Sequence, residues 1–257
     1  MRILLFCEAE ADARTARTLI DETLLFRCGA WVRDLFEQDP KHVREWVADT
    51  ALGREWHDVH NVYAVAAQLG IRRVHGHFDG QRGQAGAIML ATIARIARAL
   101  NHDENARIDA LVVMWDMDKQ SNERRDGLEQ GAAHVPPDML FVLGCPNPVR
   151  ETWVLAGFDA QTELEKQTLD ALHGELGFWP HEEPHQLTAA NEQAKRSAKR
   201  VTKALALTPE RELSCLRIEE ADRRARFASR GAGCGLEEFL QALEARLVPH
   251  VDPGATH

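Results

Sequence analysis

The chain has 257 residues, of which 44% are hydrophobic and 28% are charged, as in a globular protein with a sizeable core. The formal net charge of −9 argues against a broad basic surface, so a polyanionic substrate would have to meet a local basic patch or a metal. The 5 cysteines are scattered without a CxxC spacing, which argues against a disulfide framework and against a zinc ribbon.

The N-terminal third of the chain predicts one strand, then helices, then a second strand. Ile3 to Phe6 is a short apolar run that predicts a buried strand, and Ala13 to Leu25 carries apolar residues at helical spacing. Residues 41–51 and 56–69 predict two further helices, and residues 71–75 predict a second strand. Because the first apolar run is too short for a signal peptide or a membrane anchor, we expect a cytoplasmic protein without a membrane partner.

The alternation continues beyond a glycine-rich loop. We expect, in order, a helix at 85–100, a strand at 110–115, a charged helix at 121–131, a strand at 139–143 and a helix from 149 to 156. Strands that alternate with helices predict an α/β fold, with a Rossmann-like parallel sheet flanked by helices. Residues 1–160 would form this domain, with a helical insert at about 27–70, and residues 161–257 would form a helical C-terminal region packed on it.

Acidic residues follow three of the four predicted strands. Glu8 comes after the first strand, Asp116 and Asp118 end the third, and Glu151 comes after the fourth. Because the carboxyl ends of parallel strands meet at one edge of a sheet, we expect these side chains to converge there. Carboxylate oxygens are the ligands that Mg²⁺ and Mn²⁺ favour. A pair of aspartates at a strand end is a weak signal alone, and the acids near the other strands strengthen it.

The same motifs resemble a known family. Glu8, with Asp12 four residues later, resembles the first motif of the Toprim family, and MWDMDKQ resembles its second motif, the DxD. The segment FVLGCPNPVRETWVLAGF resembles the one after the fourth strand in small standalone Toprim-like proteins, which are relatives of the OLD-type (overcoming lysogenization defect) nucleases. The resemblance covers roughly residues 1 to 158. The Glu-x-Trp-x-Leu-Ala pattern of that group places a further acidic residue at Glu151.

The resemblance implies a metal-dependent nuclease or a related phosphodiester enzyme. It makes Glu8 a general acid or base, makes Asp116 and Asp118 catalytic ligands of Mg²⁺ or Mn²⁺, and adds Asp12 and Glu151 to the metal site. It also implies a nucleic acid substrate, DNA or RNA, and a role in bacterial anti-phage defence as a homodimer or with a partner protein. One departure is Ala9, where the family usually has glycine, and the acidic Glu10 leaves open which glutamate faces the site.

Basic residues near these motifs are candidates for binding substrate phosphates. Lys119 and Arg124 follow the DxD, although a solvated helix face would also explain them. The most basic stretch has its charges three and four residues apart, which predicts one positive stripe on a helix. That stripe comprises Lys195, Arg196, Lys199, Arg200 and Lys203. We select Lys199 and Lys203, and the latter would alternatively lie near the metal, as a lysine does in OLD-type sites.

Two other function classes remain open. A phosphatase of the haloacid dehalogenase type also has a DxD after an apolar strand, but there a Thr or Val normally stands where this chain has Gln120. Its motif also usually begins the domain, whereas this one lies in the middle. The third class is a non-catalytic protein that uses the acidic edge only to bind a metal or a partner.

Overall fold

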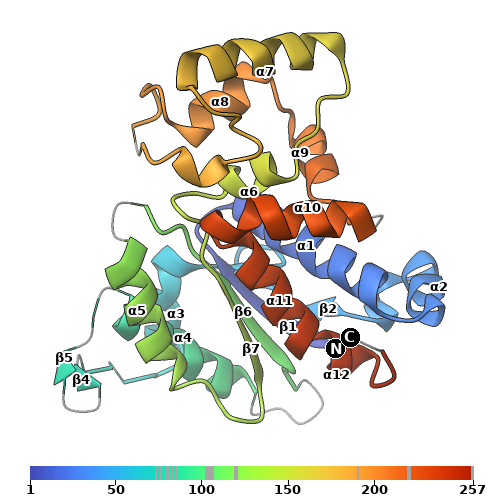
Figure 1. Cartoon of the computed structure of the whole chain (residues 1–257). Helices are drawn as coiled ribbons and strands as arrows, with labels where there is room; N and C mark the ends of the chain where they lie inside the picture. Colours follow the sequence, from blue (N-terminus) through green and yellow to red (C-terminus); the bar gives the residue numbers. More distant parts are fainter. Residues whose placement is uncertain are drawn as a thin grey trace.

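The structure is a computed structural model of the chain, and it describes residues 1–72, 74–75, 77–78, 81–82, 84, 86–101, 107–118, 121–189, 191–218 and 221–255. It is a mixed α/β protein with a parallel sheet of several strands flanked by helices, which confirms the predicted class (Figure 1). Within the described ranges, no helix is both long and apolar enough to cross a membrane.

The sheet is built around β1 (Arg2–Cys7), which pairs in parallel with β6 (Ala110–Met114). β6 in turn pairs in parallel with β7 (Leu140–Gly144). The other edge of β1 is covered by two short parallel strands, β2 (Glu45–Trp46) near its start and β3 (His57–Asp58) at its end. β1 and β6 are apolar without alternation because helices cover both of their faces.

Two hydrophobic cores lie on the two faces of the sheet. Residues Ile3, Leu5 and Cys7 belong to the first core, whereas Leu4 and Phe6 belong to the second. The first core is shared with α1 (Glu10–Arg27) and α11 (Leu236–Arg246). The second is shared with α3 (Val62–Gln68), α4 (Ala87–Leu100) and α5 (Ser121–Ala132). The period of two along β1 thus places alternate side chains in opposite cores.

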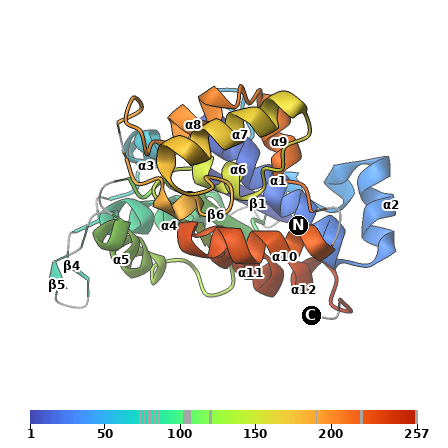
Figure 2. The same ribbon diagram turned by 45° about the horizontal axis from the view of Figure 1, so that its top comes forward.

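The helices after β7 begin at the carboxyl end of the sheet and then return to one of its faces. They comprise α6 (Glu151–Ala156), α7 (Glu163–Leu176), α8 (Ala198–Ala204), α9 (Pro209–Cys215), α10 (Ala221–Gly231), α11 and α12 (Val248–Val251). Helices α7, α8 and α9 lie beyond the carboxyl ends of the strands, while α11 runs along the sheet (Figures 1 and 2). The C-terminal region thus covers both the end and one face of the sheet.

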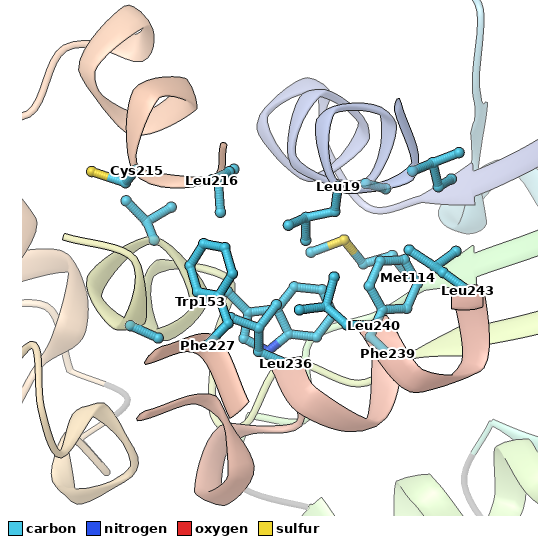
Figure 3. Packing of buried hydrophobic residues seen from close by; sticks show 14 of the residues in the cluster. Leu19, Met114, Trp153, Cys215, Leu216, Phe227, Leu236, Phe239, Leu240 and Leu243 are labelled. Carbon is cyan, nitrogen blue, oxygen red and sulfur yellow. The ribbon is translucent and has the colours of Figure 1, made fainter. Parts of the chain in front are cut away.

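The C-terminal region shares its hydrophobic core with the sheet. Trp153 of α6 stacks on Phe239 of α11 with ring centroids 5.1 Å apart. Both are buried beside Met114 of β6 and Leu19 of α1 (Figure 3). Residues on both sides of position 160 therefore contribute to one continuous core.

The segment between α1 and α3 departs from the prediction. It contains α2 (Ala30–Gln38), a 3₁₀ turn (Pro40–His42), β2, β3, a second 3₁₀ turn (Val59–Asn61) and α3. The helix predicted at 41–51 is wrong, because the backbone there pairs with the open edge of β1 and the side chain of Trp46 is buried. Pairing with β1 therefore outweighs the local helical spacing of apolar residues in this segment.

Two further predicted elements are corrected. In the range predicted as a second strand, the described residues 71–72 and 74–75 carry no strand, and a hairpin of β4 (His77–Phe78) and β5 (Gln81–Arg82) follows. In the basic stretch, the helix begins only after Ser197, whose side chain accepts a hydrogen bond from the backbone of Arg200. The prediction of one stripe on one helix is therefore wrong, since Lys195 and Arg196 precede α8.

Candidate functional site

The register of the two central strands brings Glu8 next to the DxD segment. Phe6 of β1 pairs with Val113 of β6, so the residues two positions further along each strand lie side by side. These residues are Glu8 and Trp115, and the indole nitrogen of Trp115 donates a 2.6 Å hydrogen bond to Oε1 of Glu8. His60 also approaches, with Nε2 at 3.7 Å from the same oxygen.

The neighbouring Glu10 turns to other partners. Its carboxylate accepts a hydrogen bond from the indole nitrogen of Trp56 and pairs with Arg17 at 3.2 Å. Glu8 is therefore the glutamate that lies at the edge of the sheet beside Asp118, whose charge acts on it.

The two aspartates are held by the loop that follows β7. The backbone N–H of Met117 donates to the carbonyl of Pro146 at 2.9 Å, and that of Asp118 donates to the carbonyl of Pro148 at 2.8 Å. Asp116 accepts a 3.0 Å hydrogen bond at Oδ1 from the backbone N–H of Arg150. Asp118 has a φ of 47°, a left-handed conformation that aspartate tolerates better than most residues. Backbone hydrogen bonds between the two segments thus continue beyond β6 and β7, and the loop after β7 orients the carboxylate of Asp116.

All five acidic residues selected from the sequence act on one another through their charges. Burial raises the pKa of Asp116 to about 9, with further contributions from the carboxylates of Asp12, Glu151, Glu8 and Asp118. Such a pKa means that Asp116 keeps its proton at neutral pH in the metal-free protein. Four carboxylates therefore act on Asp116, which is itself poorly solvated at the carboxyl end of the sheet.

The pKa values of two neighbouring carboxylates, Asp12 and Glu8, are also raised by burial. Burial raises the pKa of Asp12 to about 6, an effect that Arg150 opposes and that Glu8 and Glu151 reinforce. Burial likewise raises the pKa of Glu8, although the hydrogen bond from Trp115 opposes this change. Both shifts show that negative charge is held here at a cost in free energy.

A buried arginine, which the sequence reasoning missed, lies among these acids. Arg150 is only 5% exposed and is the residue that precedes α6. Its guanidinium lies 3.3 Å from Glu151 and 2.9 Å from Glu212 of α9. An arginine at the start of a short helix resembles an ordinary surface residue, and the only signal in the sequence was its position directly before Glu151.

Two of the basic residues predicted to bind substrate phosphates, Arg124 and Lys199, lie on different helices. Arg124 of α5 pairs with Asp118 at 3.2 Å and lies over the ring of Trp115 at 5.2 Å. Burial lowers the pKa of Lys199, but Glu151, Glu192 and Asp116 together raise it above its ordinary value. Lys199 of α8 pairs with Glu192 at 3.3 Å and lies within electrostatic range of Glu151 and Asp116.

The remaining two candidates are Lys203 and Lys119. Lys203 is exposed and lies one turn beyond Lys199 on α8. Lys119 lies outside the described residues. Among the basic candidates that the structure describes, Arg124 pairs with Asp118, and Lys199 lies within electrostatic range of Glu151 and Asp116.

The cluster has the donors that a hard divalent cation favours, although it is not closed around one. In the described part of the chain, no three His, Cys, Asp or Glu side chains already form a group that could hold a metal ion. However, Oε2 of Glu151 is buried and has no hydrogen-bond partner. An orphaned buried carboxylate oxygen beside an electrostatically strained aspartate fits Mg²⁺ or Mn²⁺.

Fold and site together define an α/β protein with a carboxylate cluster at the carboxyl end of a parallel sheet. Comparisons with models of known protein families, with curated protein sequences and with solved structures found no match.

Proposed function

We propose that the protein is a Mg²⁺- or Mn²⁺-dependent nuclease, or a closely related phosphodiester enzyme, of the Toprim class. The observation that carries this proposal is the meeting of the three acidic segments at one edge of the sheet: Trp115 of the DxD segment donates a 2.6 Å hydrogen bond to Glu8, and the backbone N–H of Arg150, next to Glu151, donates a 3.0 Å hydrogen bond to Asp116. Burial and the surrounding carboxylates raise the pKa of Asp116 to about 9. A divalent cation would compensate this repulsion, because its charge favours the ionised form of each ligand. The order of Glu8, Asp12, the DxD pair and Glu151 along the chain supports the Toprim relationship.

The acidic residues would divide the work between holding the ion and moving a proton. Asp116, Asp118 and Glu151 would hold the ion together with Glu8, and Asp12 lies beside them. When bound, the ion would polarise a phosphoryl oxygen and help to activate water. Glu8 has a raised pKa and an orienting hydrogen bond from Trp115, so its free oxygen is suited to accept or donate a proton.

A local group of basic side chains would bind the substrate in spite of the net charge of −9. Arg124 of α5 pairs with Asp118, and Lys199 of α8 lies within electrostatic range of Glu151 and Asp116, so the two come from separate parts of the chain. A phosphodiester between them would be neutralised on both sides while it contacts the ion. We therefore propose DNA or RNA as the substrate.

The cellular setting follows from the resemblance alone. Small standalone relatives of the OLD-type nucleases imply a role in bacterial defence. We propose that this protein acts in the cytoplasm, as a homodimer or with a partner protein of such a system.

Cleavage assays with the purified chain test the chemistry. We expect single- or double-stranded DNA or RNA to be cut with Mg²⁺ or Mn²⁺, and we expect EDTA and Asp116→Ala to abolish cutting. Asp138→Ala is the matched control, because Asp138 is an exposed aspartate that pairs with Arg107. Full activity in Asp116→Ala, or in EDTA, would contradict the proposal.

The same preparation separates the two alternatives. Turnover of a small phosphate monoester with a trapped aspartyl-phosphate would identify a phosphatase of the haloacid dehalogenase type. Binding of Mn²⁺ without cleavage of any nucleic acid would identify a non-catalytic protein.

A further inference from the structure

The buried guanidinium of Arg150 lies against the acidic cluster, and the inner side of the cluster is defined as the side that this guanidinium contacts. Its Nε lies 3.7 Å from Oδ1 of Asp12, and its Nη2 lies 3.3 Å from Oε1 of Glu151. Nη1 donates to Glu212 at 2.9 Å and to Thr15 at 3.3 Å. A guanidinium that is 5% exposed and contacts three carboxylates is a fixed positive charge within the site.

The carboxylate oxygens fall into two groups around this charge. Asp12 directs Oδ1 toward Arg150, and its Oδ2 accepts a 3.0 Å hydrogen bond from the backbone of Ala9. Both oxygens of Asp12 are therefore already engaged by the protein. Glu151 directs Oε1 toward Arg150 and leaves Oε2 buried without a hydrogen-bond partner. Of the four carboxylate oxygens of Asp12 and Glu151, the one left without a partner is Oε2 of Glu151, which points away from the guanidinium contact and is called its outer oxygen.

A second divalent ion on the inner side would meet strong repulsion. In two-metal sites the ions lie about 3.5–4 Å apart and share carboxylates. An ion on Oδ1 of Asp12 or on Oε1 of Glu151 would stand directly against the guanidinium, which already lies within 3.7 Å of both atoms. The inner position of a two-ion arrangement is thus taken by the protein's own cation.

We propose that Arg150 serves in place of a second metal, so that the site binds one divalent ion per chain, held by Glu8, Asp116, Asp118 and the outer oxygen of Glu151. This inference rests on the proposed metal-dependent function and deepens it. Arg150 is a positioning residue in this scheme, because it fixes Asp12 and Glu151 rather than contacting the substrate. Glu212 of α9 holds the guanidinium from the far side, which connects the C-terminal helices to the metal site.

Counting bound Mn²⁺ tests this inference without any assay of activity. The chain is titrated with Mn²⁺ alone, and free ion is measured by its electron paramagnetic resonance signal while calorimetry gives the binding ratio. We expect one ion per chain in the wild type and in Arg150→Lys, which keeps the charge. We expect two ions per chain in Arg150→Met, because Asp12 and the inner oxygen of Glu151 then lack their cation.

A control and a second variant protect the test against simple unfolding. Arg224→Met removes another buried arginine, one that pairs with Glu237 and Glu244 away from the cluster. It should lose comparable stability and keep one ion per chain. Arg150→Met combined with Glu212→Gln removes the carboxylate that the single variant would strand, and it should also bind two ions.

The possible outcomes are distinct. Two ions in the wild type, or one ion in both Arg150→Met variants, would overturn the role of Arg150 and leave the proposed function standing. No Mn²⁺ bound by the wild type would overturn both. One ion in the wild type and two in the Met variants would establish Arg150 as the substitute for the second metal.

Discussion

The indole nitrogen of Trp115 lies 2.6 Å from Oε1 of Glu8 and donates a hydrogen bond to it. The two residues come from adjacent parallel strands, and the pair forms because β1 and β6 are in register at Phe6 and Val113. A second pair of the same kind lies nearby, in which Trp56 donates to Glu10. The chain therefore contains both a candidate catalytic pair and a natural control for it.

Replacing Trp115 with Phe tests the role of this hydrogen bond. The ring remains buried while Glu8 loses its donor, and a hydrogen bond to a charged group contributes about 1.5–3 kcal/mol. We expect metal-dependent cleavage to decrease by roughly tenfold or more. Trp56→Phe removes the equivalent bond to Glu10 and should leave cleavage unchanged, as measured by initial rates at saturating Mn²⁺. Equal losses in the two variants would mean that Glu8 has no special role.

Asp116→Asn should stabilise the metal-free protein while it removes metal binding. Asparagine keeps an acceptor for the N–H of Arg150 and adds donors toward the surrounding carboxylates. Because the raised pKa of Asp116 opposes folding at neutral pH, we expect a gain on the order of 1–3 kcal/mol in the free energy of unfolding. Chemical denaturation measures the gain, and Asp138→Asn at an exposed site should change it by less than about 0.5 kcal/mol. A loss of stability in Asp116→Asn would show that the surrounding carboxylates do not destabilise the ionised form of Asp116.

The pKa of Asp116 also predicts how the metal-free protein depends on pH. The folded state holds this proton up to about pH 9, whereas the unfolded chain releases it near pH 4. The free energy of unfolding should therefore decrease as the pH rises from about 4 to about 9. This decrease should be smaller in Asp116→Asn, and denaturation at several pH values measures it. A slope equal to that of the wild type would assign the pH dependence to other groups.

Proton release on metal binding is a separate consequence. If Asp116 is a ligand, it must ionise when Mn²⁺ binds at pH 7, so close to one proton should leave the protein. Calorimetric titration in two buffers with different ionisation enthalpies measures that number. We expect it to decrease toward zero as the pH approaches 10. Binding of Mn²⁺ at pH 7 without any proton release would show that Asp116 lies outside the ligand set.

The acidic cluster could be predicted from the sequence because it depends only on the order and direction of the strands. Acids placed after parallel strands must meet at one edge, so Glu8, Asp116 and Glu151 could be placed together without knowing any side-chain position. The sequence alone could not decide between Glu8 and Glu10, because the choice depends on which of two tryptophans donates to which carboxylate. Arg150 was missed for the same reason, since its burial depends on Glu212 from a distant helix.

The errors in the fold have a similar cause. The segment at 41–51 has a local period compatible with a helix, but the unpaired edge of β1 recruits Glu45 and Trp46 as a strand. The long basic helix fails because Ser197 caps a helix that starts late, after Lys195 and Arg196. Local pattern predicted the central strands well, because those are apolar on both faces whatever surrounds them.

The shared core predicts that both parts of the chain unfold together. Phe239 of α11 is fully buried against Trp153, so Phe239→Ala should cost about 3–5 kcal/mol of unfolding free energy. The sheet and the C-terminal helices should show one common transition, measured by circular dichroism and by tryptophan fluorescence. Leu164→Ala at a 73% exposed position of α7 is the control and should have little effect. Two separate transitions would indicate that residues 161–257 fold independently.

Lys199 and Lys203 lie one turn apart on α8, and their replacement tests how the substrate is held. Lys199 feels the charges of Glu151 and Asp116, so Lys199→Met should reduce kcat/KM for nucleic acid by roughly tenfold. Lys203 is exposed at the next turn, and we expect Lys203→Met to reduce it by only about twofold to threefold. Lys166→Met on α7, at an exposed lysine that pairs with Glu163, should have no effect.

The dependence on salt distinguishes a phosphate contact from a structural role. If Lys199 binds a phosphate, the rate of Lys199→Met should fall less steeply with added salt than that of the wild type, because one ionic contact fewer is screened. Equal salt dependence together with a lower melting temperature would mean that Lys199 only stabilises α8 through Glu192. Rates measured between low and moderate salt, with melting curves for each variant, separate these two results.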